Sequence, residues 1–279
     1  MSKVQGKRSF ARALLARFLS ACFAAAPCSA CAFWGSHGAG IVDRIGGDKK
    51  IYLTLDACGG KHDRKLIEFL RAEKIPATLF MTGAWIGANR KAAEELAADP
   101  LFLIQNHGAE HRPASVSGRA AYKIAGAKDE AGFRAELDGG ARAVASIGAC
   151  PPKWYRSGTA FYDDGALALL AASRIAAAGF AISADAGATL PPRAVYAAAV
   201  KAKGGDIILA HMNKPESGTR EGLARAVVEL KKRGFAFALL PKTPPGKSLR
   251  SRFRRSVRPM RRRRPCARKK LVASCPLLS

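Results

Sequence analysis

Short apolar runs that end in a charged or polar residue recur along this sequence, and they constrain its fold more than any other feature. Three such runs lead into Asp56, Asp185 and His211. Helix-like stretches separate the runs, and apolar runs that alternate with helices are typical of buried parallel strands. The sequence therefore predicts an α/β fold built on a parallel sheet.

The apolar runs and the helix-like stretches between them give the expected strands and helices of one domain, residues 33–241. This length suits a single α/β domain. Strands are expected at 51–55, 77–81, 101–105, 180–184, 207–210 and 235–240, and helices at 64–74, 89–99, 120–147 (one or two), 164–178, 192–203 and 221–233.

The residues that end the apolar runs have the chemistry of an active site. In barrels of parallel strands, reactive side chains lie at the carboxyl ends of the strands. Asp56, Asp185 and His211 fall at such ends, and Arg156 follows the aromatic pair Trp154-Tyr155 in the same way. Each residue alone is as consistent with a loop or a helix cap, but the four together indicate a catalytic site.

Two further histidines, His107 and His111, are four residues apart. This spacing brings two imidazoles to one point on a helix or a tight turn, and neutral imidazole is a common metal ligand. Together with a carboxylate base such as Asp56, the pair would suit metal-assisted hydrolysis.

The motifs and their order resemble those of the polysaccharide deacetylases of carbohydrate esterase family 4. The segments that carry the resemblance are Thr-Leu-Asp-Ala-Cys-Gly-Gly at 54–60, Asn-His-Gly-Ala-Glu-His-Arg-Pro at 106–113, Arg-Ser-Gly-Thr at 156–159, Asp-Ala-Gly-Ala-Thr at 185–189 and Leu-Ala-His-Met-Asn at 209–213. They are most similar to a bacterial branch with Asp-Ala-Cys-Gly-Gly in its first motif. The resemblance spans roughly residues 50–240. It implies a distorted, incomplete (β/α) barrel of the polysaccharide-deacetylase type.

The resemblance also implies an activity and the residues that carry it. The substrate would be an N-acetylated sugar in a polysaccharide, a peptidoglycan or a chitooligosaccharide. Asp56 would be the general base and His211 the general acid that protonates the leaving amine. Arg156 would hold Asp56 ionised, and Asp185 would orient His211. A backbone amide near residues 158–159 would help to stabilise the oxyanion.

By the same resemblance, His107 and His111 would hold a divalent metal, with zinc expected and cobalt or nickel as alternatives. The sequence departs from the family here, because its first motif usually has a second acid that serves as the third ligand. Ala57 stands at that position and cannot bind a metal. Catalytic zinc usually has three protein ligands, so a replacement is expected.

Asp63 is the replacement that we expect, since it follows the flexible Gly59-Gly60 turn. The alternative for Asp63 is an N-cap of the helix that begins at Arg64, and one carboxylate could partly serve as both. His62 and Cys58 are further candidates for the third ligand.

Three other functions stay open on the sequence. The first is a catalytically inactive carbohydrate-binding relative that lost its metal with Ala57, and the second is a hydrolase of another non-peptide amide. Retention of Asp56, Arg156, Asp185 and His211 favours activity over pure binding. The third is a cationic adhesin of the cell envelope with an incidental domain.

The N-terminal segment, residues 1–32, has the features of a signal peptide. It holds five Lys or Arg and no acid, and an apolar stretch then leads to Ala30-Cys31-Ala32. Small residues in that arrangement suit a signal peptidase, and the apolar stretch is too short to span a membrane. We expect an exported protein, periplasmic or secreted. Lipid anchoring at Cys22 and a cytosolic N-terminal helix are the alternatives.

The C-terminal segment, residues 242–279, carries much of the charge. Fourteen Lys or Arg and no acid lie between 242 and 270, so of the net charge of +26 only +7 belongs to the part between the two terminal segments. We expect a disordered basic tail whose partner is an anionic envelope polymer or lipid surface, or an extension without function. Nothing predicts a fold that would position it on a nucleic acid, so no specific nucleic-acid partner is expected.

Only two cysteines, Cys58 and Cys150, lie between the two terminal segments. An exported protein could join them in a disulfide, and the sequence leaves their pairing open because it does not give their separation.

Overall fold

The computed structural model describes residues 33–244 of the 279. The expected signal peptide and nearly all of the expected tail lie outside the described residues, so those two assignments stay predictions.

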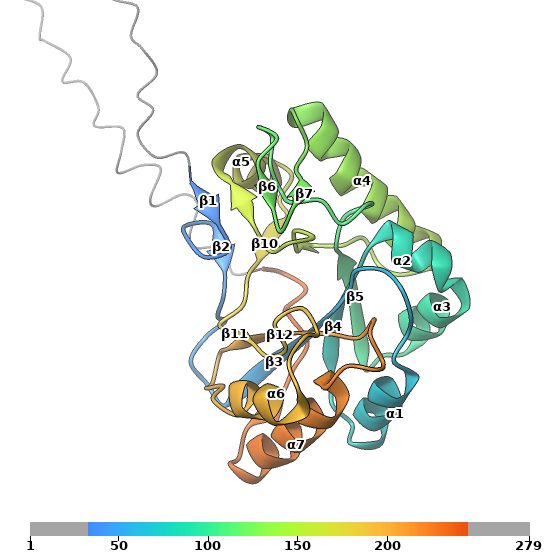
Figure 1. Cartoon of the computed structure of the whole chain (residues 1–279), viewed down its shortest axis with the longest axis vertical. Coiled ribbons are helices and arrows are strands. Elements are labelled where there is room, and N and C mark those ends of the chain that lie inside the picture. The colour runs from blue at the N-terminus through green and yellow to red at the C-terminus, as the bar shows by residue number, and fades with distance from the viewer. Residues whose placement is uncertain (1–32, 245–279) are drawn as a thin grey trace, which may run out of the picture. The chain divides into compact units, whose positions relative to one another are not determined.

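The described elements follow each other in the order expected of alternating strands and helices (Figure 1). They are β1 (Trp34–Gly35), β2 (Ile41–Val42), β3 (Lys50–Ala57), α1 (Arg64–Ala72), β4 (Ala77–Met81), α2 (Gly83–Ala88), α3 (Arg90–Ala98), β5 (Phe102–Asn106), β6 (Ala120–Ala121), β7 (Ile124–Ala125), α4 (Glu130–Ser146), β8 (Trp154–Tyr155), β9 (Tyr162–Asp163), α5 (Asp164–Ala172), β10 (Ala176–Ala178), β11 (Ile182–Ser183), α6 (Pro192–Ala199), β12 (Ile207–His211), α7 (Thr219–Lys232) and β13 (Ala236–Phe237).

The main sheet is parallel, with the strand order β11-β12-β3-β4-β5-β8-β10-β2, and β13 pairs with the start of β3. The longest strands, β3, β4, β5 and β12, stand side by side. Their register places Asp56 beside His211, and Met81 beside Asn106. The residues that end these strands are therefore neighbours across the sheet, as the carboxyl-end rule predicts.

The sheet curls until its two edges meet. β11 is at one end of the strand order and β10 is next to the strand at the other end, yet only residues 179–181 separate them in the chain. This short crossing segment is held on both sides, because the Gly179 amide donates to Val42 and the Ala181 amide donates to Ile207. The Ile207 amide in turn donates to Asp43, just beyond β2. The predicted distorted, incomplete (β/α) barrel is confirmed.

Helices cover the outside of the sheet, and their apolar faces agree with their sequence periodicity. In α1 the buried residues are Leu66, Ile67 and Leu70, which recur at helical spacing. α1 contacts α7, and α7 packs along α6 (Figure 1). The main core lies between these helices and β3, β4 and β12, where Leu53, Leu55 and Leu79 are fully buried.

None of the helices between residues 33 and 244 is long and apolar enough to cross a bilayer.

Several sequence-based assignments need correction. The strand expected at 180–184 occupies only Ile182–Ser183, and the helix expected at 192–203 ends at Ala199. The helix expected at 120–147 occupies only Glu130–Ser146, and a small hairpin of β6 and β7 precedes it. The helix expected at 164–178 ends at Ala172, because Arg174 takes a left-handed conformation with φ of 56° and the chain then enters β10. The final strand is two residues long rather than six.

Helix α4 approaches the end of β5 closely, and this contact positions the histidine motif. The Asn106 side chain donates to Leu137 of α4 and accepts from the Gly108 amide, at 2.8 Å each. At Gly140, a β-carbon would lie within 2.7 Å of both the Asn106 side chain and the Gly108 backbone. Only glycine therefore lets α4 reach this loop.

We expect Gly140→Ala to lower the free energy of unfolding by about 1–3 kcal/mol, because the added methyl group overpacks the contact between α4 and the loop. Gly87 of α2 is the matched control, since a β-carbon there meets nothing within 4 Å. Gly87→Ala should be neutral or stabilise by up to about 1 kcal/mol through helix propensity. Urea unfolding measures both, and equal effects at the two positions would contradict the proposed packing role.

Candidate active site

The ends of the central strands open into a cleft of about 540 Å³. Asp56, His111 and His211 line it, together with Gly158 and Thr159. The structure thus brings the carboxylate and two of the histidines that the sequence singles out to one cavity. The backbone predicted to stabilise an oxyanion lies on its wall.

Arg156 lies against Asp56 in the interior. One guanidinium nitrogen, Nη1, donates to Asp56 Oδ1 and to Thr54 Oγ1, both at 2.8 Å, and Nη2 donates to the Gly179 carbonyl at 2.9 Å. The guanidinium also stacks over the Phe80 ring, 4.3 Å from its centroid. Burial alone would raise the pKa of Asp56, but the Arg156 charge and the nearby imidazoles hold this pKa below its ordinary value. Asp56 is therefore ionised at neutral pH.

Asp185 holds His211 at the other side of the cleft. Its Oδ1 lies 2.8 Å from His211 Nδ1, and its Oδ2 accepts from the His211 amide and from Thr219 Oγ1 at the same distance. Burial alone would lower the pKa of His211, but Asp185 first, and Cys58 beside it, raise this pKa well above the ordinary histidine value. The imidazole is thus oriented and charged, which suits a proton donor.

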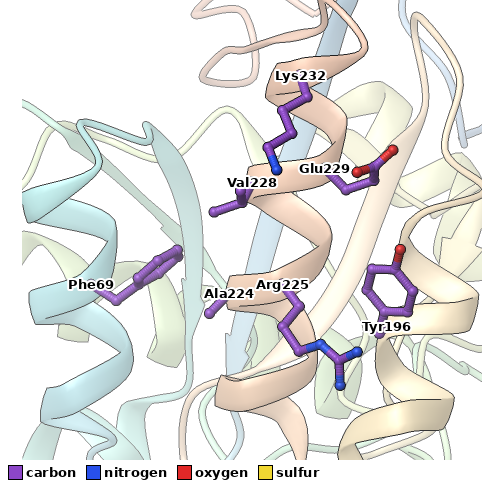
Figure 2. A pocket seen from close by; sticks show the side chains of 7 residues that line it. All are labelled: Phe69, Tyr196, Ala224, Arg225, Val228, Glu229 and Lys232. Carbon is purple, nitrogen blue, oxygen red and sulfur yellow. The ribbon is translucent and has the colours of Figure 1, made fainter.

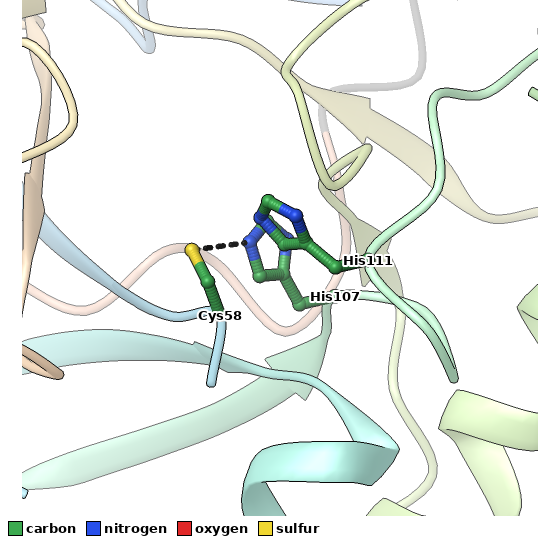
Figure 3. Close-up of side chains that lie close together, drawn as sticks. All are labelled: Cys58, His107 and His111. Carbon is green, nitrogen blue, oxygen red and sulfur yellow. Dashed lines mark hydrogen bonds between the residues drawn. The ribbon is translucent and has the colours of Figure 1, made fainter. Parts of the chain in front are cut away.

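His107 and His111 meet beside Cys58, and Figure 3 shows the three side chains converging. One potential ligand atom from each lies within 4.8 Å of the other two. His107 Nδ1 is 2.9 Å from the Arg156 carbonyl oxygen, so this nitrogen carries the proton and Nε2 presents a lone pair. His111 Nε2 is buried and has no hydrogen-bond partner among the described residues.

Such a group fits a divalent metal ion. Two imidazole nitrogens with free lone pairs and one sulfur are ligands that zinc accepts, and an unpartnered buried nitrogen is costly unless something binds it. His107 and His111, the two ligands that the resemblance implies, are therefore placed together as a metal would require.

Asp63, the third ligand expected from the sequence, is not part of this group. Its Oδ1 accepts from the Leu66 amide at 3.1 Å, and Arg220 Nη1 lies 3.3 Å from the same oxygen. The alternative role of Asp63 as the N-cap of α1 is thus present, and a metal-binding role for Asp63 stays a prediction that this arrangement does not favour. His62 is outside the group as well, and its ring meets the edge of Trp85.

Glu136 of α4 supports the histidine loop, and nothing in the sequence reasoning identified it. Its carboxylate is buried and accepts from the amides of Glu110 and Arg112 at 3.0 Å. Its own carbonyl accepts from the Ala109 amide. The loop between the two histidines is therefore held by hydrogen bonds from its backbone amides to Glu136. The only sequence signal for Glu136 is an acid on the apolar face of a helix.

The aromatic residues divide between the core and the cleft. Trp85, Trp154 and Tyr162 are fully buried and belong to the core. Tyr122, by contrast, is 76% exposed and lines the cleft with Phe180.

Both cysteines of the described part, Cys58 and Cys150, are free, so the structure contains no disulfide between them.

A second hollow, of about 400 Å³, lies between α1, α6 and α7 (Figure 2). Its polar side chains are Arg225, Glu229 and Lys232, and Arg225 stacks over the ring of Tyr196. It has no histidine, no cysteine and only one carboxylate, and it shares no lining residue with the cleft. Catalytic chemistry therefore belongs to the cleft at the strand ends.

Comparison with known families agrees with this geometry. The family model described as "Polysaccharide deacetylase" matches residues 43–194, which is more than half of the chain. The chain belongs to the polysaccharide deacetylase family. The match ends before His211, so the assignment of His211 to the site depends on the structure and on the motif around that residue. The predictions of this family and of a glycan deacetylase enzyme are confirmed at the level of the family.

Solved structures of carbohydrate esterase family 4 share the fold of this deacetylase. A CE4 family pseudoenzyme from Bacillus anthracis is 18% identical with a TM-score of 0.59, over 70% of this chain and 65% of that one, so the chain spans just under two thirds of its length. The Bc1960 peptidoglycan N-acetylglucosamine deacetylase is 16% identical (TM-score 0.62, 73% of this chain, 92% of that one). PdaA of Bacillus subtilis, a family 4 carbohydrate esterase, is 20% identical (TM-score 0.58, 72% and 82%). No curated protein matches the sequence.

We expect Asp185→Asn to lower the pKa of His211, since the carboxylate that stabilises the imidazolium is lost. Because the folded-state pKa is raised, the charged imidazole stabilises the wild-type fold below pH of about 6.5. This contribution disappears as the pH rises through the folded-state pKa. NMR titration of the histidine ring protons, with His211→Gln for assignment, measures the change.

Asp43→Asn is the control for this experiment, because Asp43 faces the exposed His37 instead. It should leave the His211 titration unchanged. A wild-type His211 that titrates at or below pH 6.5 would contradict the assigned role of Asp185.

Proposed function

We propose that this polysaccharide deacetylase is an active, metal-dependent hydrolase that removes acetyl groups from N-acetylated sugars of a polysaccharide, peptidoglycan or chitooligosaccharide. The observation that carries the proposal is the cleft in which an ionised carboxylate and a charged histidine face the same cavity, each held by its own buried partner. A binding protein would need neither the base nor the acid.

Asp56 is the general base in this proposal. Arg156 occupies its Oδ1, while Oδ2 lies 3.5 Å from His107 Nε2, beside the group of potential metal ligands. The lowered pKa of Asp56 keeps it ready to accept a proton from the attacking water.

His211 is the general acid. An amine is a poor leaving group unless it is protonated, and the raised pKa of His211 keeps a proton available at neutral pH. Asp185 fixes the imidazole through Nδ1, which leaves Nε2 as the nitrogen that carries the transferable proton. This acid suits an N-acetyl group better than an O-acetyl ester, whose alcohol leaves more easily.

A divalent cation held by His107, His111 and a third ligand would supply a Lewis acid that polarises the acetyl carbonyl and favours ionisation of the attacking water. Zinc is the ion that we propose, since imidazole ligands suit it, with cobalt or nickel as substitutes. Gly158 and Thr159 line the same cleft. The Gly158 amide donates to the Arg112 carbonyl, so the Thr159 amide is the one that would share the oxyanion charge.

Export and attachment to the envelope complete the proposal. The basic start, the short apolar stretch and the small residues before residue 33 support export. The fourteen Lys or Arg between 242 and 270 support attraction to an anionic polymer or lipid surface.

We expect the full chain loaded with zinc to release acetate from chitooligosaccharides, peptidoglycan fragments or a small acetyl ester. Asp56→Asn should lower kcat by about 10²–10⁴-fold, since the general base is lost, and His107→Ala should lose both metal and activity. Val228→Ala, in the hollow of Figure 2, is the control and should keep full activity. Circular dichroism checks that the variants are folded.

Folded wild-type protein that releases no acetate with zinc, cobalt or nickel would overturn the proposal. It would favour an inactive carbohydrate-binding relative. One similar structure is described as a CE4 family pseudoenzyme.

For export, we expect the mature protein in a bacterial host to begin at Phe33 and to sediment with the envelope at low salt. High salt should release it, because charge attraction to a surface is screened. A chain that ends at residue 241 should stay soluble at low salt, and a variant with residues 261–264 changed to Gln is the milder control. A precursor that keeps residues 1–32, or salt-independent sedimentation, would contradict this proposal.

A further inference from the structure

The first motif of this chain leaves one metal-ligand position to be filled. Ala57 has no ligand atom and is fully buried in the main core. His107 and His111 alone make a weak site, because catalytic zinc usually has three protein ligands. The structure has to supply the third ligand from another residue.

Cys58 is the next residue along the chain, just beyond the end of β3, and its side chain points at the two imidazoles (Figure 3). The distance from Cys58 Sγ to His107 Nε2 is 3.5 Å. Ligands about 2.0–2.3 Å from a tetrahedral centre lie roughly 3.5 Å from one another. The separation of these two atoms is therefore the one that a shared metal would require.

Both histidines present an Nε2 atom that is able to bind a metal. The hydrogen bond from His107 Nδ1 to the Arg156 carbonyl leaves Nε2 as an acceptor facing the sulfur. His111 Nε2 is buried without a hydrogen-bond partner in the described part of the chain. His111 itself has a φ of 64°, a left-handed conformation that a non-glycine residue adopts only when its surroundings fix it there.

The nearby carboxylates are less well placed than the sulfur. Asp63 Oδ1 accepts from the first turn of α1 and is paired with Arg220. Asp56 Oδ1 binds Arg156, and although Asp56 Oδ2 lies 3.5 Å from His107 Nε2, Asp56 is not one of the three residues whose ligand atoms all converge. Cys58 is thus the third ligand that the described residues offer.

We propose that Cys58 binds the metal as a thiolate, which gives this deacetylase a Cys-His-His site. The inference deepens the proposed function, because it names the third ligand of the metal that the reaction would use. Binding displaces the thiol proton to solvent, so one proton leaves Cys58 for each metal bound. A thiolate favours zinc or cobalt over magnesium, calcium or manganese. Alkylating reagents then distinguish the free Cys58 thiol from the metal-bound thiolate, which reacts more slowly.

The first test is the absorption spectrum of the full chain loaded with Co²⁺. A thiolate bound to Co²⁺ gives a charge-transfer band in the near ultraviolet, and carboxylate or imidazole ligands do not. Cys58→Ala should remove the intensity of one thiolate, and Cys58→Asp should remove it while Co²⁺ stays bound. Cys150→Ala is the matched control, because Cys150 is exposed and free. It should leave the band unchanged, and comparing variants corrects for the cysteines at 22, 28, 31, 266 and 275.

The second test is protection of Cys58 from iodoacetamide, measured for each cysteine by mass spectrometry of peptides from the full chain. Zn²⁺ should slow alkylation of Cys58 at least about tenfold, as expected when most of the thiolate is metal-bound. Labelling of Cys150 in the same molecule should not change. His111→Ala should abolish the protection of Cys58 by removing a ligand.

Bound zinc with unprotected Cys58, together with a cobalt band that survives Cys58→Ala, would overturn the inference. Loss of metal in Asp63→Asn would then assign the third ligand to that carboxylate. The result is separate from the proposed function, because neither readout needs turnover. Protected Cys58 without acetate release would overturn only the deacetylation, and acetate release with unprotected Cys58 would overturn only the thiolate ligand.

Discussion

The buried Arg156 guanidinium is the interaction on which the rest of the site depends. It joins Asp56 and Thr54 of β3 to the Gly179 carbonyl in the segment that closes the barrel, and it stacks on Phe80 of β4. The backbone carbonyl of the same residue fixes the tautomer of His107. A fully buried cation is tolerable only when it is paired and hydrogen-bonded, so the position of each partner of Nη1 and Nη2 is constrained by the others. Ionisation of the base, closure of the barrel and orientation of a metal ligand thus depend on one residue.

The long strands could be predicted because their sequences satisfy two requirements at once. β3, β4, β5 and β12 are apolar runs long enough to be recognised, and a polar residue lies at or next to the end of β3, β5 and β12. β10 is only three residues long and leaves no period to detect, and of the strand expected at 180–184 only the two residues of β11 pair in the sheet. The Ala-rich sequence after Asp164 has high helix propensity throughout, and it is the left-handed turn at Arg174 that ends the helix. The hairpin of β6 and β7 could not be predicted either, because its turn has no sequence signal. Tyr122 and Lys123 form the turn with positive φ, and neither is a glycine.

The site could be predicted from the sequence to the extent that its residues end strands. Asp56, Arg156, Asp185 and His211 meet in the structure because the carboxyl ends of neighbouring parallel strands and the loops after them share one edge. The third metal ligand could not be settled in this way. Asp63 and Cys58 both follow β3, and only the packing of α1, with its need for an N-cap, separates their roles. The role of Glu136 could not be predicted from the sequence, because Glu136 lies on a helix and contacts Glu110 of the histidine loop, 26 residues earlier in the chain.

The strand order divides the site into two parts with different contact orders. Cys58 follows β3, and His107 and His111 follow β5, with only β4 between these two strands in the sheet, so the closure that assembles them spans about 50 residues. The pairing of Asp56 with Arg156 spans 100 residues, and β3 pairs with β12 at a separation of about 155 residues, far more than within the metal-binding part. A chain that folds from its N-terminus would complete the metal ligands first and the proton-transfer residues last. Capture of a metal would therefore precede catalytic competence during folding of this protein.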